Sequence, residues 1–346
     1  MDVMNERSGR NAQGGHGTVG VVRGIRVLGC AAFALVLVTM TLFGDILDPL
    51  APAAEASTRA TITQTSTGYT VRTPTGADPD IFSVVFPAAD AAQADAGASA
   101  LLPGAVLTTR GAPRAGDFDY IDDSGEDSGF HVATTGVDFS KPWGVLFWFE
   151  GDGDSTTAST IPDSPRLSDL ATVAAAHNMV LVVPDTPDSG NPTDVTWWED
   201  YAGNGAWFRG LESMLAGTWA VDTTRVWFAG YSGGADFIST ELLPSGNDWI
   251  VGGGAVMIGG GETPDVGGAH TPAMRSMPLT WYVGSVDGQV DSDGWSPLKV
   301  STQGEAAWRT NGFTNTSLVV LSGLQHTDYD PAALVDRSLT SGGVTR

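Results

Sequence analysis

Cysteine is almost absent from this chain of 346 residues, in which Cys30 is the single example. One cysteine cannot form an intramolecular disulfide, and any thiolate nucleophile would have to be that residue. Lysine is nearly as rare, because only Lys141 and Lys299 occur. Without disulfides the fold must be stabilised by its hydrophobic core, which a chain of this length can supply.

Positive charge is scarce in general, with 17 basic residues against 40 acidic ones and a net charge of -23. Nucleic-acid binding requires clustered cations, so we expect no nucleic-acid partner. The acidic excess suits a soluble exported protein. Because 42% of the residues are hydrophobic and 9% are aromatic, the chain has the composition of a packed globular protein and not of a disordered one.

Residues 1–56 have the pattern of a secretory signal. Arg23 and Arg26 precede a charge-free apolar run at 27–43, and a stretch of small residues ends at Ala56. This order predicts cleavage after Ala56, with the rest of the chain outside the membrane. The alternative is that the segment stays as a single membrane anchor, although the run is short for a span. We therefore expect a secreted protein, or one anchored to the outer face of the cytoplasmic membrane through this segment alone.

Residues 57–129 form an N-terminal extension whose structure the sequence leaves open. Two segments, 61–73 and 81–86, have a composition typical of strands, whereas the Ala/Asp-rich stretch 88–100 suits a linker or a surface helix. Acidic residues crowd 116–127, which suggests either a calcium loop or a solvated acidic loop. The spacing lacks the Asp-x-Asp-x-Asp-Gly form, so we expect a solvated loop.

From residue 130 to residue 346, segments typical of strands alternate with segments typical of helices. Continuous apolar runs indicate strands that are covered on both faces. The expected strands are 130–135, 144–149, 179–183, 225–229, 250–258, 279–283 and 317–321, and the expected helices are 167–177, 207–217, 299–310 and 331–339. This alternation predicts a domain of the α/β class over residues 130–346, with a mostly parallel sheet and helices on both faces.

The segment Gly230-Tyr231-Ser232-Gly233-Gly234 follows one of the apolar runs and precedes residues able to form a helix. Gly-x-Ser-x-Gly in this position is the pattern of a nucleophile elbow, a sharp turn that lifts a serine hydroxyl clear of a sheet. Glycine is needed on either side because the turn brings backbones close together. In a glycine-rich chain the same pattern also arises by accident, so Ser232 needs support from a base and an acid elsewhere.

A serine hydroxyl needs an imidazole to take its proton and a carboxylate to orient that imidazole. On this kind of sheet the acid and then the histidine follow the serine, each in a loop after a later strand. Asp287 follows the strand 279–283, and His326 follows the strand 317–321, so both have the required order. Asp287 is also the type of residue that merely caps a turn. The alternatives that stay open are His270 as the base and Asp291, Asp293 or Asp265 as the acid.

The negative charge that develops on the substrate carbonyl must be met by backbone N–H groups. One should come from Gly233, directly after the serine, and the other from the loop Glu150-Gly151-Asp152-Gly153-Asp154. Asp152 N–H is the first choice, with Gly151 or Gly153 as the alternatives. The acidic side chains of this loop should point away from the oxyanion.

Three aromatic residues are candidates for substrate binding. Tyr231 is expected either to pack beneath the nucleophile or to border the acyl pocket. Trp197 and Trp198 are expected either to form a stacking wall or to pack in the core. The glycine-rich segment 251–261 does not match Gly-x-Gly-x-x-Gly, so no dinucleotide site is expected, and no metal-ligand motif is found.

Several stretches together resemble a known family: Trp197-Trp198, the segment 207–234 with its Asp-x-x-Arg-Val lead-in at 222–226, and the segments 284–290 and 323–327. Over residues 130–335 the chain resembles secreted α/β-hydrolase esterases of the polyhydroxybutyrate depolymerase and feruloyl esterase group. The resemblance implies an α/β-hydrolase fold, a triad of Ser232, Asp287 and His326, and hydrolysis of carboxylic esters. The chain departs from the family in having Glu150 where a histidine is usual and in lacking disulfides.

The sequence therefore predicts a secreted serine esterase that acts on a small or polymeric ester without a cofactor. One alternative is a serine peptidase or amidase that uses the same residues. The other is a catalytically silent binding protein of the cell envelope that retains the hydrolase fold, an interpretation that Glu150 favours.

Overall fold

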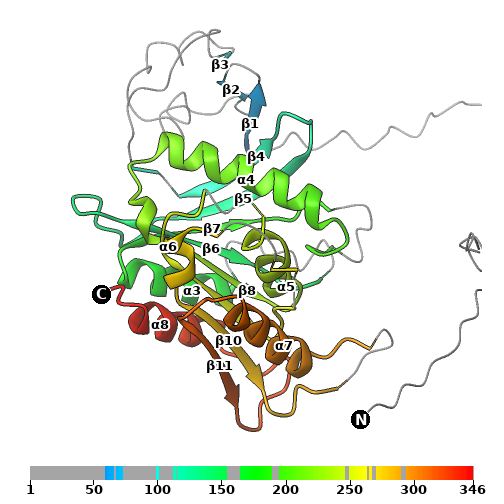
Figure 1. Cartoon of the computed structure of the whole chain (residues 1–346). Helices are drawn as coiled ribbons and strands as arrows, with labels where there is room; N and C mark the ends of the chain where they lie inside the picture. Colours follow the sequence, from blue (N-terminus) through cyan, green and yellow to red (C-terminus); the bar gives the residue numbers. More distant parts are fainter. Residues whose placement is uncertain are drawn as a thin grey trace, which may run out of the picture. The chain divides into compact units, whose positions relative to one another are not determined.

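The computed structural model describes residues 59–65, 68–72, 99–100, 112–113, 115–153, 164–188, 195–245, 249–262, 265–266, 270–289 and 294–345 (Figure 1). The predicted signal or anchor at 1–56, the strand-like segment 81–86 and the alternative acids Asp291 and Asp293 lie outside the described residues. Within the described ranges, every helix is too short or too polar to cross a bilayer.

The described strands form one eleven-stranded sheet in the order β11-β10-β9-β8-β6-β7-β5-β4-β1-β2-β3. The strands are β1 (Ala60–Thr65), β2 (Gly68–Arg72), β3 (Ser99–Ala100), β4 (Gly116–Ile121), β5 (Asp127–Ala133), β6 (Gly144–Phe149), β7 (Met179–Pro184), β8 (Val226–Tyr231), β9 (Gly254–Ile258), β10 (Leu279–Gly284) and β11 (Thr316–Leu321). Strands β6 to β11 run parallel to their neighbours among these six, and β5 pairs antiparallel with β7. The strands expected from residue 130 onward are all present.

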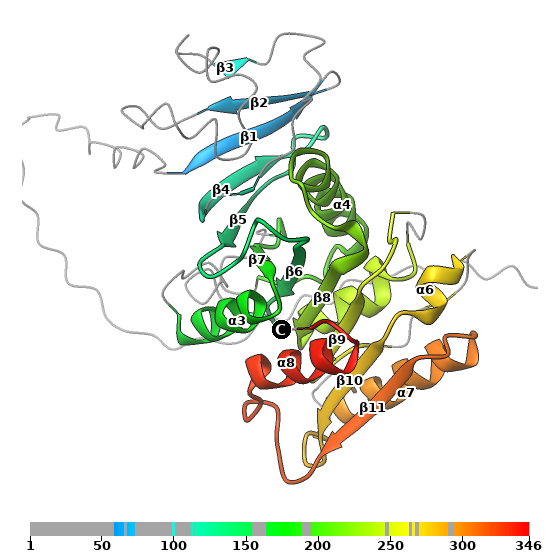
Figure 2. The same cartoon turned by 90° about the vertical axis from the view of Figure 1, so that its left-hand side faces the viewer.

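Helices cover both faces of the sheet (Figure 2). The helices α3 (Pro165–Ala176) and α8 (Pro331–Ser341) lie on one face, and α4 (Tyr201–Thr218), α5 (Gly233–Phe237) and α7 (Pro297–Thr310) on the other. Shorter helical segments are η1 (Thr223–Arg225), η2 (Ile238–Leu242) and α6 (Pro272–Ser276). A mostly parallel sheet, helices on both faces and a sharp turn from β8 into α5 make this an α/β-hydrolase fold, as predicted.

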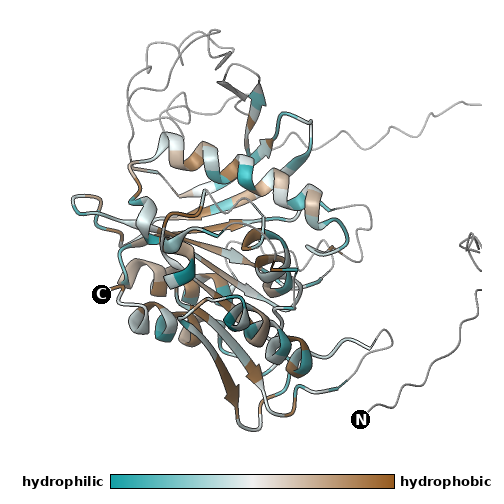
Figure 3. Cartoon of the chain, viewed as in Figure 1, coloured by the Kyte–Doolittle hydropathy of each residue, from teal (hydrophilic) through white to brown (hydrophobic). Residues whose placement is uncertain are grey.

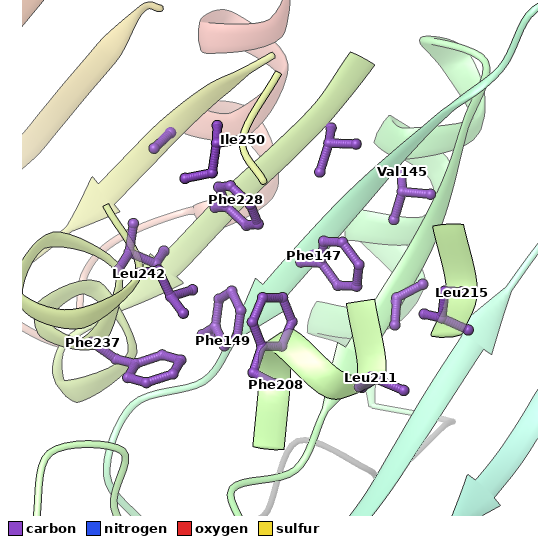
Figure 4. Close-up of a cluster of buried hydrophobic side chains, with 14 of the residues drawn as sticks. Val145, Phe147, Phe149, Phe208, Leu211, Leu215, Phe228, Phe237, Leu242 and Ile250 are labelled. Carbon is purple, nitrogen blue, oxygen red and sulfur yellow. The ribbon is translucent and has the colours of Figure 1, made fainter. Parts of the chain in front are cut away.

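The six residues of β6 show why the central strands are apolar throughout. Phe147 and Phe149 point toward α4, where the ring of Phe208 lies 5.0 and 4.9 Å from theirs (Figure 4). Leu146 and Trp148 point to the opposite face, into the core beneath α3 and α8. Because both sets of alternating side chains are buried, the strand reads as a continuous hydrophobic run.

The helix α4 begins at Tyr201, well before the expected start at residue 207. The carboxylate of Asp200 caps it by accepting a hydrogen bond from Gly203 N–H at 3.0 Å. A Cβ on Gly205 would lie 2.5 Å from Cγ of Glu241, so glycine lets the helix approach its neighbour closely. Hydrophilic and hydrophobic residues alternate along α4 (Figure 3), as on a helix that is buried on one side. The sequence concealed this first turn because glycine is a poor helix former.

The expectation of a solvated acidic loop at 116–127 is wrong for most of that segment. It forms β4 and the start of β5, an antiparallel hairpin in which Phe118 and Tyr120 are buried. The Asp122 carboxylate closes the turn by accepting N–H bonds from Ser124 and Glu126, each at 2.9 Å. The intervening acids hid a two-residue alternation that is typical of a strand. Strands β4 and β1 thus extend the sheet to the N-terminal side of residue 130.

Candidate active site

The turn between β8 and α5 places Ser232 in a backbone conformation that is rare for a residue with a side chain. Its φ is 52° and its ψ is −121°. A Cβ on Gly230 would lie 2.6 Å from the carbonyl carbon of Gly234, so a side chain cannot fit at that approach. The Ser232 N–H donates to the Ile258 carbonyl at 2.9 Å, which ties the turn to β9. Strain of this kind, held by the surrounding structure, is found at functional sites.

The Ser232 hydroxyl contacts an imidazole. His326 Nε2 lies 3.0 Å from Ser232 Oγ, and Nδ1 of the same ring lies 2.9 Å from Asp287 Oδ2. Asp287 is only 5% exposed. The structure therefore places the three predicted residues in one hydrogen-bonded row, which can move a proton from the hydroxyl to the imidazole.

The three residues meet because the strands before them are parallel. Ser232 follows β8, Asp287 follows β10 and His326 follows β11, so all three loops lie at the carboxyl edge of the sheet. Hydrogen bonds join the last two loops directly: Ser285 N–H donates to the Leu321 carbonyl at 2.8 Å, and Val286 N–H donates to the Leu324 carbonyl at 3.2 Å.

Aromatic rings surround His326. The Tyr231 ring lies 5.0 Å from the imidazole, and Tyr231 OH donates to the His326 carbonyl at 2.9 Å. Burial raises the pKa of Tyr231 to about 12, so its hydroxyl stays a donor near neutral pH. Trp295 packs edge-on against the imidazole at 5.9 Å, and Tyr329 packs at 6.2 Å. Tyr231 thus packs against the imidazole of His326 and binds the backbone carbonyl of the same residue.

The other described candidates for base and acid do not occupy the positions beside Ser232 Oγ and His326 Nδ1. His270 is buried between Trp308 and Phe313, with ring centroids 5.7 and 4.9 Å away. The position beside His326 Nδ1 is taken by Asp287 and not by Asp265.

The loop after β6 lies directly against the nucleophile. A Cβ on Gly151 would lie 2.9 Å from Ser232 Cβ. Gly151 N–H points toward its neighbour Glu150 Oε1 at 3.3 Å, and Gly153 N–H donates to the Val195 carbonyl at 3.2 Å. Gly233 N–H lies in the first turn of α5, where N–H groups have no acceptor within the helix. The N–H groups of Gly233 and Asp152 remain our prediction for the oxyanion hole, with Gly151 as the alternative.

The expectation that the Asp152 side chain points away from this region is wrong. A Cβ on Gly233 would overlap Asp152 Oδ1, and Trp198 Nε1 donates to Asp152 Oδ2 at 2.9 Å. The indole therefore holds an exposed carboxylate beside the first residue of α5. Negative charge at this place opposes the formation of an oxyanion.

Glu150 has two partners that its position in the sequence did not reveal. Its carboxylate accepts a hydrogen bond from Trp148 Nε1 at 3.1 Å and forms an ion pair with Arg166. The Arg166 guanidinium lies over the Tyr231 ring, 5.5 Å from its centroid. Arg166 thus compensates the charge of Glu150. The position of Glu150 in the loop gave no sign of this partner.

A cavity of about 500 Å³ opens beside Ser232 and Gly233. Trp198, which is 41% exposed, lines it together with Tyr201 and Trp295. Of the two expected positions, Trp197 takes the one in the core: it is 3% exposed and stacks on Phe237 at 4.6 Å, so its assignment as a substrate-binding residue is wrong. Adjacent tryptophans therefore point in opposite directions, one into the core and one into the cavity.

Acidic groups form part of the cavity wall. Asp236 is buried and accepts N–H bonds from Gly261 at 2.5 Å and from Glu262 at 2.9 Å. Burial, together with the nearby Glu262 carboxylate, raises the pKa of Asp236 well above its ordinary value. Burial also raises the pKa of Glu262. Lys299 is exposed and also lines the cavity. Within the described ranges, no group of His, Cys, Asp and Glu side chains is arranged to hold a metal ion.

The sequence did not reveal three residues that contact the hydrogen-bonded row or line the cavity. Tyr329, Trp295 and Asp236 contact the row or line the cavity, yet none belongs to a recognisable motif. Tyr329 lies three residues after His326, and this proximity is the only signal that could have pointed to it.

No protein-family model and no curated protein sequence matches the chain. Among solved structures it is similar to LpqC, a poly(3-hydroxybutyrate) depolymerase from Bordetella parapertussis, with 14% identity, a TM-score of 0.47 and coverage of 66% of this chain and 90% of that one. It is also similar to XC6422 from Xanthomonas campestris, an α/β serine hydrolase without a lid (13%, TM-score 0.43, coverage 68% and 96%), and to Est1E from Butyrivibrio proteoclasticus (12%, 0.43, 66% and 97%). What the chain does has to be inferred from its own side chains.

Proposed function

We propose that this protein is a secreted serine esterase that hydrolyses carboxylic esters through an acyl-enzyme. One observation carries the proposal: a single imidazole, that of His326, lies 3.0 Å from the Ser232 hydroxyl and 2.9 Å from the buried Asp287 carboxylate. Serine on a strained elbow, with a base and an orienting acid in line, is the arrangement that makes a hydroxyl nucleophilic.

In the first half of the reaction, Ser232 Oγ attacks the ester carbonyl carbon while His326 Nε2 takes the hydroxyl proton. Asp287 stabilises the imidazolium and holds Nδ1 protonated. The N–H groups of Gly233 and of Asp152, or of Gly151, bind the oxyanion. The tetrahedral intermediate then collapses, the C–O bond to the alcohol breaks, and the alcohol leaves with the proton from His326.

In the second half, water attacks the acyl-enzyme. His326 takes a proton from the water and returns it to Ser232 Oγ as the carboxylic acid leaves. The cavity beside Ser232 holds one side of the ester, and Trp198 provides its exposed aromatic surface. Each step uses protein side chains and water, so the reaction requires no cofactor. We propose that the substrate is a small-molecule or polymeric ester and that the enzyme hydrolyses it outside the cell or at the outer face of the membrane.

A fluorophosphonate probe tests the proposal, because such probes react only with an activated serine. Wild type should be labelled and Ser232→Ala should not, with circular dichroism showing that both are folded. Matched p-nitrophenyl esters and p-nitroanilides then distinguish an esterase from an amidase, and esters of increasing chain length together with hydroxycinnamate esters define the acyl group.

A second candidate is a catalytically silent binding protein, which the Asp152 carboxylate beside Gly233 favours. Such a protein would retain the cavity and bind an ester without cleaving it. A folded wild type that takes no label but binds p-nitrophenyl esters, detected by quenching of tryptophan fluorescence, would support this candidate over the esterase.

A further inference from the structure

Tyr329 adds a fourth member to the hydrogen-bonded row. Its hydroxyl donates to Asp287 Oδ2, the same oxygen that faces His326 Nδ1. The hydroxyl also accepts a hydrogen bond from Gly284 N–H at 2.8 Å, at the end of β10. Tyr329 therefore connects the carboxylate to the strand from which the Asp287 loop starts.

The fold makes room for this side chain. Tyr329 lies between His326 and the first turn of α8, and its ring packs 6.1 Å from that of Tyr231. A Cβ on Gly259 would lie 2.8 Å from Tyr329 Cε2, and Gly259 has a φ of 61°, which favours glycine. The end of β8 and the loops after β9, β10 and β11 thus all contribute to the position of one phenol.

We propose that Tyr329 is a positioning residue that fixes the Asp287 carboxylate for His326 and sets how strongly this carboxylate holds the imidazolium. The proposal rests on the proposed function, since it assigns a role within the same row.

A carboxylate shares its negative charge among the donors that bind it. Two donors on Oδ2 fix the rotation of the Asp287 side chain, which fixes the tautomer and the plane of the imidazole. Charge that the phenol withdraws from Oδ2 is no longer available to stabilise a proton on His326. Burial and the bond to Asp287 raise the pKa of Tyr329, so the phenol remains a donor at any working pH.

Other polar and charged groups near the imidazole do not take over this role. Tyr231 meets His326 from β8 and donates to its carbonyl. Arg166 lies over the Tyr231 ring, 5.5 Å from its centroid, and is paired with Glu150. Asp328, in the His326 loop, accepts a hydrogen bond from Gln325 N–H at 3.1 Å. Among the described residues, Tyr329 is the phenol whose hydroxyl is bonded to the acid of the row.

The test compares Tyr329→Phe with Tyr282→Phe. Tyr282 is a matched control because its buried hydroxyl bonds Ser338 Oγ at 3.0 Å in the same region, without touching the row. In p-nitrophenyl ester hydrolysis, Tyr329→Phe should lower kcat about tenfold with little change in KM. It should also shift the midpoint of the acid limb of the kcat/KM profile up by roughly half a pH unit. Tyr282→Phe should change neither quantity.

A titration of His326 by NMR measures the effect of Tyr329 on the imidazole independently of ester hydrolysis. In protein labelled with ¹⁵N-histidine, and with His326→Gln to assign the signal, the titration midpoint of His326 should move upward in Tyr329→Phe and stay in place in Tyr282→Phe. Equal midpoints in wild type and Tyr329→Phe would overturn the proposal, even if the variant were less stable. An upward shift in a protein that takes no fluorophosphonate label would retain the role of Tyr329 and refute the esterase.

Discussion

The two sides of Ser232 are built in opposite ways. On the imidazole side, His326 packs against aromatic rings and faces the carboxylate of Asp287, whose oxygen is bound by two donors. On the side where we propose the oxyanion hole, the loop after β6 brings the carboxylate of Asp152 against Gly233. One side is arranged to support the transfer of a proton, and the other carries a negative charge that would oppose the proposed oxyanion.

The two sides should therefore differ in how substitutions affect the proposed reaction: the imidazole side is required for it, whereas Asp152 only changes its rate. The imidazole side contains the groups that transfer the proton, so replacing Ser232, Asp287 or His326 should lower activity by orders of magnitude. On the other side, the negative charge of Asp152 can be removed by substitution, so at least one variant there should have a higher kcat than wild type.

The largest effect is expected from breaking the imidazole side with Asp287→Asn. An amide at this position favours the wrong tautomer of His326, so kcat should fall by about 10³ to 10⁴. The measurement is steady-state hydrolysis of p-nitrophenyl acetate. Asp291→Asn and Asp293→Asn are the controls, because each removes a carboxylate from the same loop and should change kcat less than twofold. A normal rate in Asp287→Asn would assign the acid to another residue.

Replacing each of the two adjacent tryptophans with alanine should change a different measured quantity: stability for Trp197 and KM for Trp198. Trp197→Ala leaves a hole beside Phe149 and Phe237 and should lower the free energy of unfolding by about 3 to 5 kcal/mol, measured by urea denaturation. Trp198→Ala should leave stability within about 0.5 kcal/mol, because the ring is half exposed, and should raise KM several-fold. If Trp198→Ala were the destabilising change, the assignment of wall and core would have to be reversed.

A third prediction separates pH effects on stability from those on the site. Glu212 borders a small cavity near Trp249, at the amino end of β8, and burial raises its pKa to about 7. Since its ordinary value is 4.5, the native state binds more protons than the unfolded state between pH 4.5 and 7. Stability should therefore fall as pH rises through this window and level off above it.

The variant Glu212→Gln removes that dependence. Above pH 7 it should exceed wild type by on the order of 1 to 2 kcal/mol, and at pH 4.5 the two should be nearly equal. Urea denaturation at several pH values measures both. Parallel curves for the two proteins across the window would show that Glu212 is not the group responsible, and kcat should be the same in both throughout.

The smallest effect concerns the oxyanion side. Asp152→Asn keeps an acceptor for Trp198 Nε1 and removes the charge beside Gly233, so kcat should rise about threefold to tenfold. Glu150→Gln is the contrasting variant, because Arg166 compensates the charge of Glu150 and its removal should bring no gain. A slower Asp152→Asn enzyme would mean that the carboxylate contributes to binding or to positioning.

The sequence predicted the imidazole side better than the oxyanion side for a physical reason. Parallel strands end at one edge, so the order of the apolar runs was enough to bring Ser232, Asp287 and His326 together. The direction of Asp152 and of Trp197 depends on packing between distant segments, and no local pattern records it. Tyr329 was missed for the same reason, since its partners Asp287 and Gly284 are far away in the sequence.

Local composition also concealed parts of the fold. In the first turns of α4, Gly205 allows close packing against Glu241 and Gly203 lies against the capping carboxylate of Asp200, yet both glycines suggest a break in a helix. The half-buried acids Asp117 and Asp119 of β4 concealed the alternation of Phe118 and Tyr120. In both places tertiary contacts determine the structure and override the propensity of single residues.

The central claim is that the imidazole of His326 makes the hydroxyl of Ser232 nucleophilic, and mapping of a fluorophosphonate adduct by tandem mass spectrometry tests it most directly. We predict one adduct per chain, on Ser232, formed by wild type and slowed by at least about a thousandfold in a folded His326→Ala variant. An adduct on a different serine, or equal labelling of Ser232 in wild type and His326→Ala, would contradict the account.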